Sequence, residues 1–314
     1  MKGAFMKTIK EEMNYIMKRN DFYHSLMDYA KTDGFIQVES DLFEGVFDFI
    51  ESNDRFDIKS LIKLEDKNGE IYILRPDITT NIIKQVIPRM TDDDFLKLFY
   101  LDNVYAYGQG GQMKASRQFG VEMIGGDAYK KEEELFTFIE GLLNQYQMSY
   151  EIEIGNQLFI DILIGEMTDN RQVKTNIKDA LMKKNIQQLR QALDMDNLYA
   201  KLLIMLLEPN NDIISIKTFI ESNELNTKLI DEINRTLTMI ENINQSNITI
   251  DLSLISPYDY YNGPIFKGYI KGYPNDVFRG GRYDTLTKKY GRLTKALGFS
   301  LDIGPFMKEV LRNE

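Results

Sequence analysis

The strand-like segments of this chain come in neighbouring pairs joined by tight turns, and this pattern limits the possible folds more than any other feature. Two pairs are clear: residues 56–64 with 70–75, and residues 96–107 with 117–124. Asn68-Gly69, between the first two segments, is typical of a two-residue hairpin turn. Hairpins pair strands in antiparallel fashion, whereas a doubly wound parallel sheet needs strand–helix–strand units. The sequence therefore predicts an α+β fold with an antiparallel sheet flanked by helices.

Residues 248–284 contain the densest group of aromatic and polar side chains. Apolar and polar residues alternate from Ile248 to Leu254, which predicts a strand, and a Tyr-rich strand is expected from about Asp259 to Ile270. In a regular strand Tyr260 and Tyr261 would point to opposite faces, so at most one would reach a given pocket. An antiparallel hairpin with aromatic cross-strand pairs explains the same residues without any binding function.

The length of 314 residues fits two domains, or one domain with a large insertion. From about residue 165 the pattern becomes helical, with few glycines and no strand pairs, and strand-like alternation returns at Ile248. We therefore expect three parts: residues 1–164 as the first part of one domain, 165–245 as a helical insertion, and 246–314 as the second part of that domain.

Composition excludes several classes of function. A net charge of −10 argues against a nucleic-acid partner, and the absence of cysteine removes disulfides, catalytic thiolates and Cys-ligated zinc. With His24 as the one histidine, multi-histidine metal sites are also excluded, so we predict no metal site. The chain has no apolar run of signal-peptide or membrane-spanning length, which predicts a cytoplasmic protein without membrane contact.

Six segments, in this order, resemble a known family: LRPDITT (74–80), RQFGVEMIGGD (117–127), EIEIGN (151–156), DYYNGPIF (259–266), GGRYD (280–284) and ALGFSLDI (296–303). Together they resemble the catalytic domain of histidyl-tRNA synthetase, and most closely its non-catalytic paralogue, the regulatory subunit of ATP phosphoribosyltransferase. The resemblance covers nearly the whole chain outside the helical block. It implies a class II aminoacyl-tRNA synthetase-like fold.

The chain departs from the synthetases at the positions that activate ATP. The resemblance places three of the enzyme family's arginines at Ala106, Ser256 and Pro305, and the glutamate of its Phe-Arg-x-Glu segment at Gly108. Asp41 replaces the proline of the first motif. Arginine supplies the fixed positive charge that stabilises the pentavalent phosphorus formed during adenylation. We therefore predict no catalytic residues, no cofactor and no synthetase activity.

The amino-acid pocket of the family is better preserved. The implied histidine-binding residues are Asp77, Thr79, Gln118, Glu122, Tyr260, Tyr261, Arg282 and Tyr283. The first three match positions that receive the ammonium group, and Glu122 and the tyrosines match positions that read the imidazole. Because Ser256 replaces an arginine, Arg282 is one candidate for the ligand's carboxylate. Capping of the helix after Pro76 is an alternative role for Asp77 and Thr79.

The resemblance implies a regulatory, non-catalytic subunit that a short-form catalytic ATP phosphoribosyltransferase subunit requires in the first step of histidine biosynthesis. L-Histidine would be the feedback effector, and a homodimer within a hetero-oligomer would form through the apolar stretch 35–49. The resemblance also implies no tRNA partner, because the chain ends after the third motif with no anticodon-binding domain. Two alternatives stay open: a catalytically inactive synthetase-like module with another protein partner, and a degenerate histidine-activating enzyme.

Overall fold

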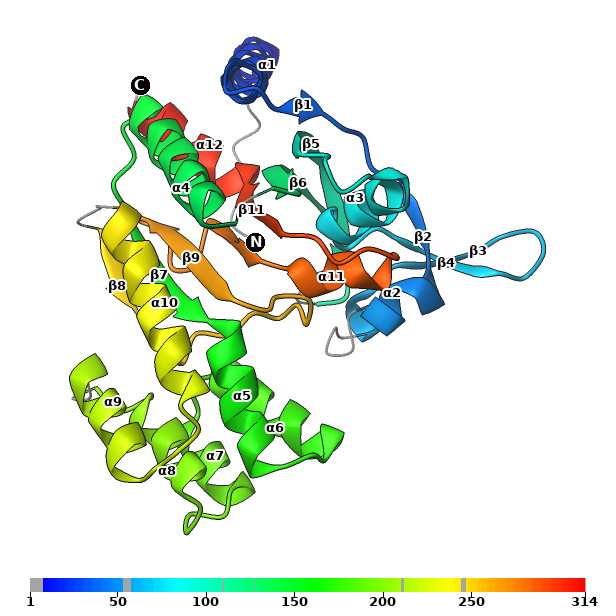
Figure 1. The fold of residues 1–314 in the computed structure, drawn as a ribbon. Helices are drawn as coiled ribbons and strands as arrows, with labels where there is room; N and C mark the ends of the chain where they lie inside the picture. The colour runs from blue at the N-terminus through cyan, green and yellow to red at the C-terminus, as the bar shows by residue number, and fades with distance from the viewer. Residues whose placement is uncertain are drawn as a thin grey trace.

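The computed structural model describes residues 8–52, 58–108, 110–126, 128–209, 212–243 and 247–313. Within these residues a sheet of eight strands runs through the centre of the molecule (Figure 1). In spatial order its strands are β1 (Ile36–Gln37), β5 (Leu96–Tyr107), β6 (Met113–Ile124), β11 (Ala296–Asp302), β10 (Phe278–Arg282), β9 (Pro264–Ile270), β7 (Tyr150–Asn156) and β8 (Ile248–Ile250). All neighbouring strands from β5 to β7 pair antiparallel, and only the short outer strands β1 and β8 pair parallel. The predicted antiparallel sheet is confirmed for this interior.

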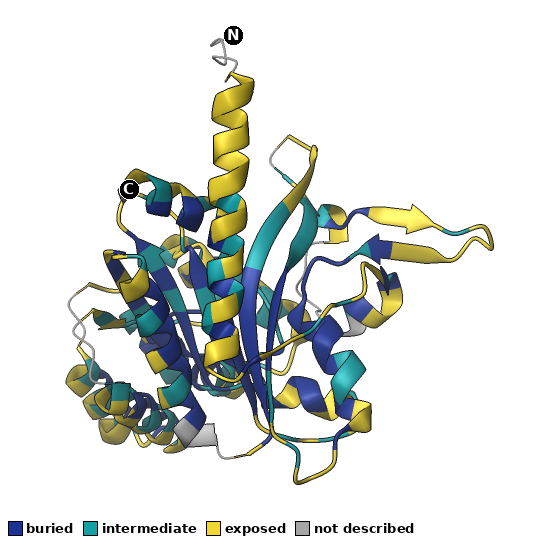
Figure 2. Cartoon of the chain, turned by 90° about the horizontal axis from the view of Figure 1, so that it is seen from above, coloured by how far each residue is buried: buried dark blue, intermediate teal, exposed yellow. Residues whose placement is uncertain are grey.

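One face of the sheet is covered by α1 (Ile9–Thr32), α4 (Ala128–Gln145) and α12 (Ile303–Asn313) (Figure 1). Their apolar side chains form the largest core together with inward-facing residues of the central strands, such as Val121 and Met123. Figure 2 shows these strands buried, whereas the N-terminal half of α1 extends away from them and is exposed.

The opposite face is covered by α3 (Thr79–Val86) and α11 (Asp284–Lys289), which form a smaller core with Leu98, Tyr100 and Ile124. Because successive strand residues alternate between faces, Glu122 lies on this second face while its neighbours lie on the first. Tyr283 and Tyr260 lie here as well.

A second, three-stranded sheet lies beside the main one and projects from it as an arm (Figure 1). Its strands are β2 (Phe43–Gly45), β4 (Ile71–Leu74) and β3 (Lys63–Glu65), with α2 (Val46–Ser52) packed against it. The predicted hairpin around Asn68-Gly69 is confirmed, because Gly69 has a φ of 84° at the turn. Its first strand is shorter than expected, since residues 58–60 form a 3₁₀ turn instead, and residues 56 and 57 lie outside the described residues.

The described residues between 157 and 243 are helical. They form α5 (Gln157–Met167), α6 (Arg171–Met182), α7 (Ile186–Ala192), α8 (Leu198–Met205), α9 (Ile213–Ser222) and α10 (Lys228–Ile243). These helices share a core of their own, and α10 runs back to pack on α4 and β7. The helices begin earlier than the expected boundary at residue 165, because Asn156 caps α5 by accepting the Phe159 N–H at 3.2 Å.

Two predicted strands in the 248–284 stretch are wrong in extent. β8 ends at Ile250, because the Asp251 carboxylate accepts the Ser253 N–H at 2.9 Å and turns the chain. The Tyr-rich strand begins only at Pro264, and residues 258–263 are irregular. The strand prediction at 96–107 is confirmed, and the return strand begins at Met113, ahead of the expected residue 117. The helical pattern in the sequence also predicts a helix that begins at Asp127, but this residue lies outside the described residues.

Candidate functional site

A pocket opens on the second face of the main sheet, beside the N-terminus of α3. Its cavity volume is about 20 Å³, so the side chains that line it lie close together in this structure. Its lining residues are Asp77, Thr79, Tyr100, Gln118, Glu122, Tyr258, Tyr260, Tyr261, Arg279, Tyr283, Gly298, Phe299 and Ser300. Seven of the eight residues predicted from the sequence therefore meet in one place, from segments far apart in the chain. Arg282 is the residue that does not line it.

Glu122 lies at the bottom of this pocket, with 1% of its surface exposed. Its carboxylate accepts one hydrogen bond from the Thr79 hydroxyl at 2.6 Å and another from the Tyr283 hydroxyl. Burial raises the pKa of Glu122 to about 8, even though both hydrogen bonds favour the charged form. At pH 7 this pKa favours the neutral acid, and a cationic ligand beside it would favour its ionisation.

Gly298 makes room for this carboxylate from the neighbouring strand. It lies directly opposite Glu122 in the β6–β11 pair. A Cβ atom at position 298 would lie 2.0 Å from Glu122 Oε2 and 2.4 Å from the Val121 carbonyl oxygen. The backbone contact cannot be relieved by rotating a side chain, so the position of Glu122 requires glycine here.

Asp77 is the second buried acid of the pocket. Its carboxylate accepts the Thr80 N–H at 2.8 Å, in the first turn of α3, and the Tyr260 hydroxyl at 3.4 Å. Burial raises the pKa of Asp77, and the hydrogen bonds from Thr80 and Tyr260 oppose this rise. Asp77 thus ties the helix start to the pocket, so the expected capping role and a place in the pocket are compatible.

Four tyrosines form one wall of the pocket. Tyr258 stacks on Tyr260 with ring centroids 5.2 Å apart, and Tyr261 lies 4.8 Å from Tyr260. Tyr283 meets the ring of Tyr260 edge-on at 5.9 Å. The expectation that at most one of Tyr260 and Tyr261 reaches the pocket is wrong, because this segment is not a strand and alternation does not apply.

Sequence reasoning missed a cation in the pocket wall, Arg279 of β10. Its guanidinium donates from Nη2 to Asp302 at 3.1 Å and lies 2.8 Å from Asp276 through Nε. Gln118 donates to the other oxygen of Asp302 at 3.0 Å. The alternation of β10 could have identified Arg279, because it lies two and four residues before Gly281 and Tyr283.

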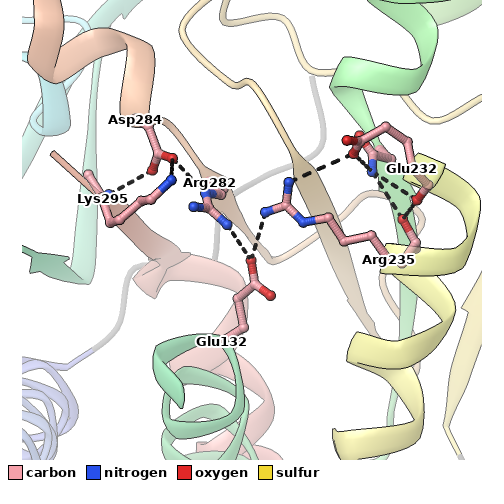
Figure 3. A network of polar contacts seen from close by, with 9 residues as sticks. Glu132, Glu232, Arg235, Arg282, Asp284 and Lys295 are labelled. Atoms are coloured by element: carbon pink, nitrogen blue, oxygen red, sulfur yellow. Dashed lines mark hydrogen bonds and ion pairs between the residues drawn. The ribbon is translucent and has the colours of Figure 1, made fainter. Parts of the chain in front are cut away.

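Arg282 points to the opposite face of the sheet, where it joins a buried network of charged groups (Figure 3). Its guanidinium lies 3.5 Å from Glu132 of α4 and donates from Nε to Asp284 at 2.8 Å. Arg235 of α10 approaches the same Glu132 oxygen at 3.8 Å, and Lys295 contacts Asp284 at 3.3 Å. Arg282 therefore connects the sheet to α4 and α11, and it is unavailable to a ligand in the pocket.

The raised pKa of Glu122 gives a testable pH dependence. Between the ordinary glutamate pKa near 4.5 and about 8, the folded protein keeps a proton that the unfolded chain releases. The free energy of unfolding should therefore fall as pH rises through this range, by up to about 1.4 kcal/mol per pH unit from this group, and level off above it.

Urea unfolding at several pH values measures this dependence. The free energy of unfolding should change less steeply with pH in Glu122→Gln than in the wild-type protein. An unchanged slope would contradict the neutral state of Glu122. Burial also raises the pKa of Glu44, to about 7. Glu44 therefore adds to the fall in the free energy of unfolding with rising pH, and it does so equally in the wild-type protein and in Glu122→Gln.

Comparison with known proteins shows which family this chain is similar to. The family model described as histidyl-tRNA synthetase matches residues 14–305. A curated relative from Clostridium novyi (strain NT), named ATP phosphoribosyltransferase regulatory subunit, is 31% identical over 96% of this chain and 73% of its own length. A relative of the same name from Clostridium botulinum (strain Langeland) is 29% identical over 95% of this chain and 72% of its own. A solved structure from Bacillus halodurans, titled an ATP phosphoribosyltransferase regulatory subunit/histidyl-tRNA synthetase, superposes with a TM-score of 0.78 at 23% identity, over 95% of this chain and 80% of that one.

The antiparallel sheet, the pocket on its second face and the family model define a class II synthetase-like domain of the histidyl type. Within that class, the chain belongs to the family of ATP phosphoribosyltransferase regulatory subunits. Among the residues that the structure describes, no helix has both the length and the apolar character needed to cross a bilayer.

Proposed function

We propose that this protein is a non-catalytic subunit that a separate, short-form ATP phosphoribosyltransferase requires for activity, and that it conveys feedback inhibition by L-histidine. The observation that carries the proposal is a relative named ATP phosphoribosyltransferase regulatory subunit, which is 31% identical over 96% of this chain. On this proposal the protein acts in the first step of histidine biosynthesis, and its effector is the end product of that pathway.

The chemistry of the pocket supports histidine as that effector. Histidine carries an ammonium group, an imidazole and a carboxylate. Glu122 and Asp77 supply two buried carboxyl groups, and the faces of the surrounding tyrosines attract cations. The Tyr and Thr hydroxyls already present on these acids can reorient around an imidazole N–H without leaving a buried polar group unpaired.

The positions that would bind ATP support a role without adenylation. Ala106 lies on β5 and Pro305 lies in α12. Because these residues are alanine and proline, neither supplies the guanidinium expected of a synthetase. Ser256 is buried, and its hydroxyl accepts the Tyr258 N–H at 3.1 Å. Without these three charges the phosphates of ATP and the transition state lose their fixed counter-charges.

We further propose that the subunit forms a homodimer through residues 35–49, as part of a hetero-oligomer with the catalytic subunit. Ile36, Phe43 and Phe47 in this segment are 68%, 53% and 73% exposed. Large apolar side chains gathered in one exposed segment are typical of a contact surface.

The experiment that tests the proposed function measures the rate of a purified short-form catalytic subunit with and without this protein. We expect a large rise in rate upon addition, with no ATP–pyrophosphate exchange by this protein alone in the presence of histidine. Exchange activity would instead support the degenerate enzyme, and no change in rate would support a module for another partner.

A further inference from the structure

We propose that Arg279 binds the carboxylate of the ligand, and that it takes the place of the arginine that Ser256 replaces. The proposal rests on the proposed binding of histidine in this pocket. It gives the ligand's carboxylate a partner in place of Arg282, the candidate named from the sequence.

The register of the sheet places Arg279 at the distance from Glu122 that a bound histidine would span between its imidazole and its carboxylate. On β11, Gly298 lies opposite Glu122, Ser300 lies opposite Arg279, and Asp302 lies opposite Gln118. Two residues along a strand span about 7 Å. A ligand whose imidazole contacts Glu122 would thus bring its α-carbon, with the ammonium and carboxylate groups, to the level between Arg279 and Gln118.

Neither the position of the missing arginine, Ser256, nor the candidate named from the sequence, Arg282, offers a group to the pocket. Ser256 does not line the pocket, and its backbone N–H and hydroxyl bond to Gln157 and Tyr258. Arg282 lies on the other face of the sheet, between Glu132 and Asp284. Among the described residues that line the pocket, Arg279 is the single cation.

The guanidinium of Arg279 is held in place and still has donors to offer. Asp276 and Asp302 engage it through Nε and Nη2, whereas an arginine has five N–H donors in a planar fork. Asp302 also accepts from Gln118, so Arg279 and Gln118 are oriented by one shared carboxylate. This preorganisation favours a bidentate contact with an incoming carboxylate.

Comparison of two ligands isolates this contact. L-Histidinol keeps the imidazole and the ammonium group of L-histidine and lacks its carboxylate. In calorimetric titrations the wild-type protein should bind L-histidine about 10- to 100-fold more tightly than L-histidinol. Arg279→Met should remove this preference, with L-histidinol binding nearly unchanged, and Arg279→Lys should restore only part of it because lysine cannot form the bidentate contact.

Arg117→Met is the matched control, because Arg117 precedes Gln118 on β6 but stands near Tyr23 of α1 on the other face. It removes the same charge and should leave the preference for L-histidine over L-histidinol intact.

If Arg279→Met keeps the full preference for L-histidine, the assignment of Arg279 is wrong while histidine binding stands. If the wild-type protein binds neither ligand, alone or with the catalytic subunit, the proposed effector is wrong and the assignment falls with it. Loss of both ligands in Arg279→Met and Arg279→Lys alike would mean that Arg279 maintains the pocket and does not select the carboxylate.

Discussion

Replacing Glu122 with alanine should weaken L-histidine binding by about 10- to 150-fold. The carboxyl group is 1% exposed, bonded to Thr79 and Tyr283, and lies where an imidazole would enter. Its removal leaves the imidazole N–H without an acceptor in a buried site, and a lost hydrogen bond to a charged group is worth about 1.5–3 kcal/mol. Isothermal titration of both proteins with L-histidine, and with ATP as a parallel ligand, measures the difference.

Glu151→Ala provides the control, because Glu151 lies on β7 of the same sheet and is exposed. This variant should bind histidine as the wild-type protein does. Glu122→Gln, which keeps the size of the side chain, should lose most of the affinity because an amide cannot become an anion. Affinity within about threefold of wild type in Glu122→Ala, in a protein that still unfolds cooperatively, would contradict the placement of the imidazole. Tight binding of ATP would contradict the reading of Ala106 and Pro305.

Arg282→Met should lower the free energy of unfolding by about 3–5 kcal/mol, because breaking a buried ion pair leaves uncompensated charges. The Arg282 side chain is 6% exposed, and its two carboxylate partners, Glu132 and Asp284, are 6% and 7% exposed. Burial raises the pKa of Glu132 although Arg235 and Arg282 both lower it. Removing one of these arginines therefore makes the remaining charge of Glu132 still more unfavourable. Urea-induced unfolding at pH 7 measures the loss.

The double variant Arg282→Met with Glu132→Gln separates lost packing from unpaired charge. It should recover part of the loss, because one of the two carboxylates is no longer left without its counter-charge. Arg117→Met, which removes a partly exposed arginine from the same face of the sheet, should change stability by less than about 1 kcal/mol. A similarly small effect for Arg282→Met would show that the network is not a source of stability.

Much of the fold follows from local patterns in the sequence. The turn at Asn68-Gly69 and the strand at 96–107 are recognisable because a tight turn and a change in hydrophobic period are local features. Glu122 could be placed correctly once its neighbours were assigned to the core, since strand residues alternate between faces.

The rest depended on geometry that no local pattern contains. Residues 258–263 are rich in tyrosine, as strands often are, yet they are irregular and place the rings of Tyr258, Tyr260 and Tyr261 on the pocket. The resemblance makes Arg282 a candidate for the ligand's carboxylate because Ser256 replaces an arginine, but Arg282 faces away from the pocket. The alternation of strand residues, counted from Tyr283, indicates Arg279 instead.

The measurement that tests the central claim most directly is histidine inhibition of the reconstituted complex. The short-form catalytic subunit would be assayed with the wild-type protein and with Glu122→Ala, across a range of L-histidine concentrations. We expect both proteins to activate the catalytic subunit, and only the wild-type complex to be inhibited with full sensitivity. Equal inhibition of the two complexes would place the effector site elsewhere, and failure of the wild-type protein to activate the catalytic subunit would contradict the regulatory role itself.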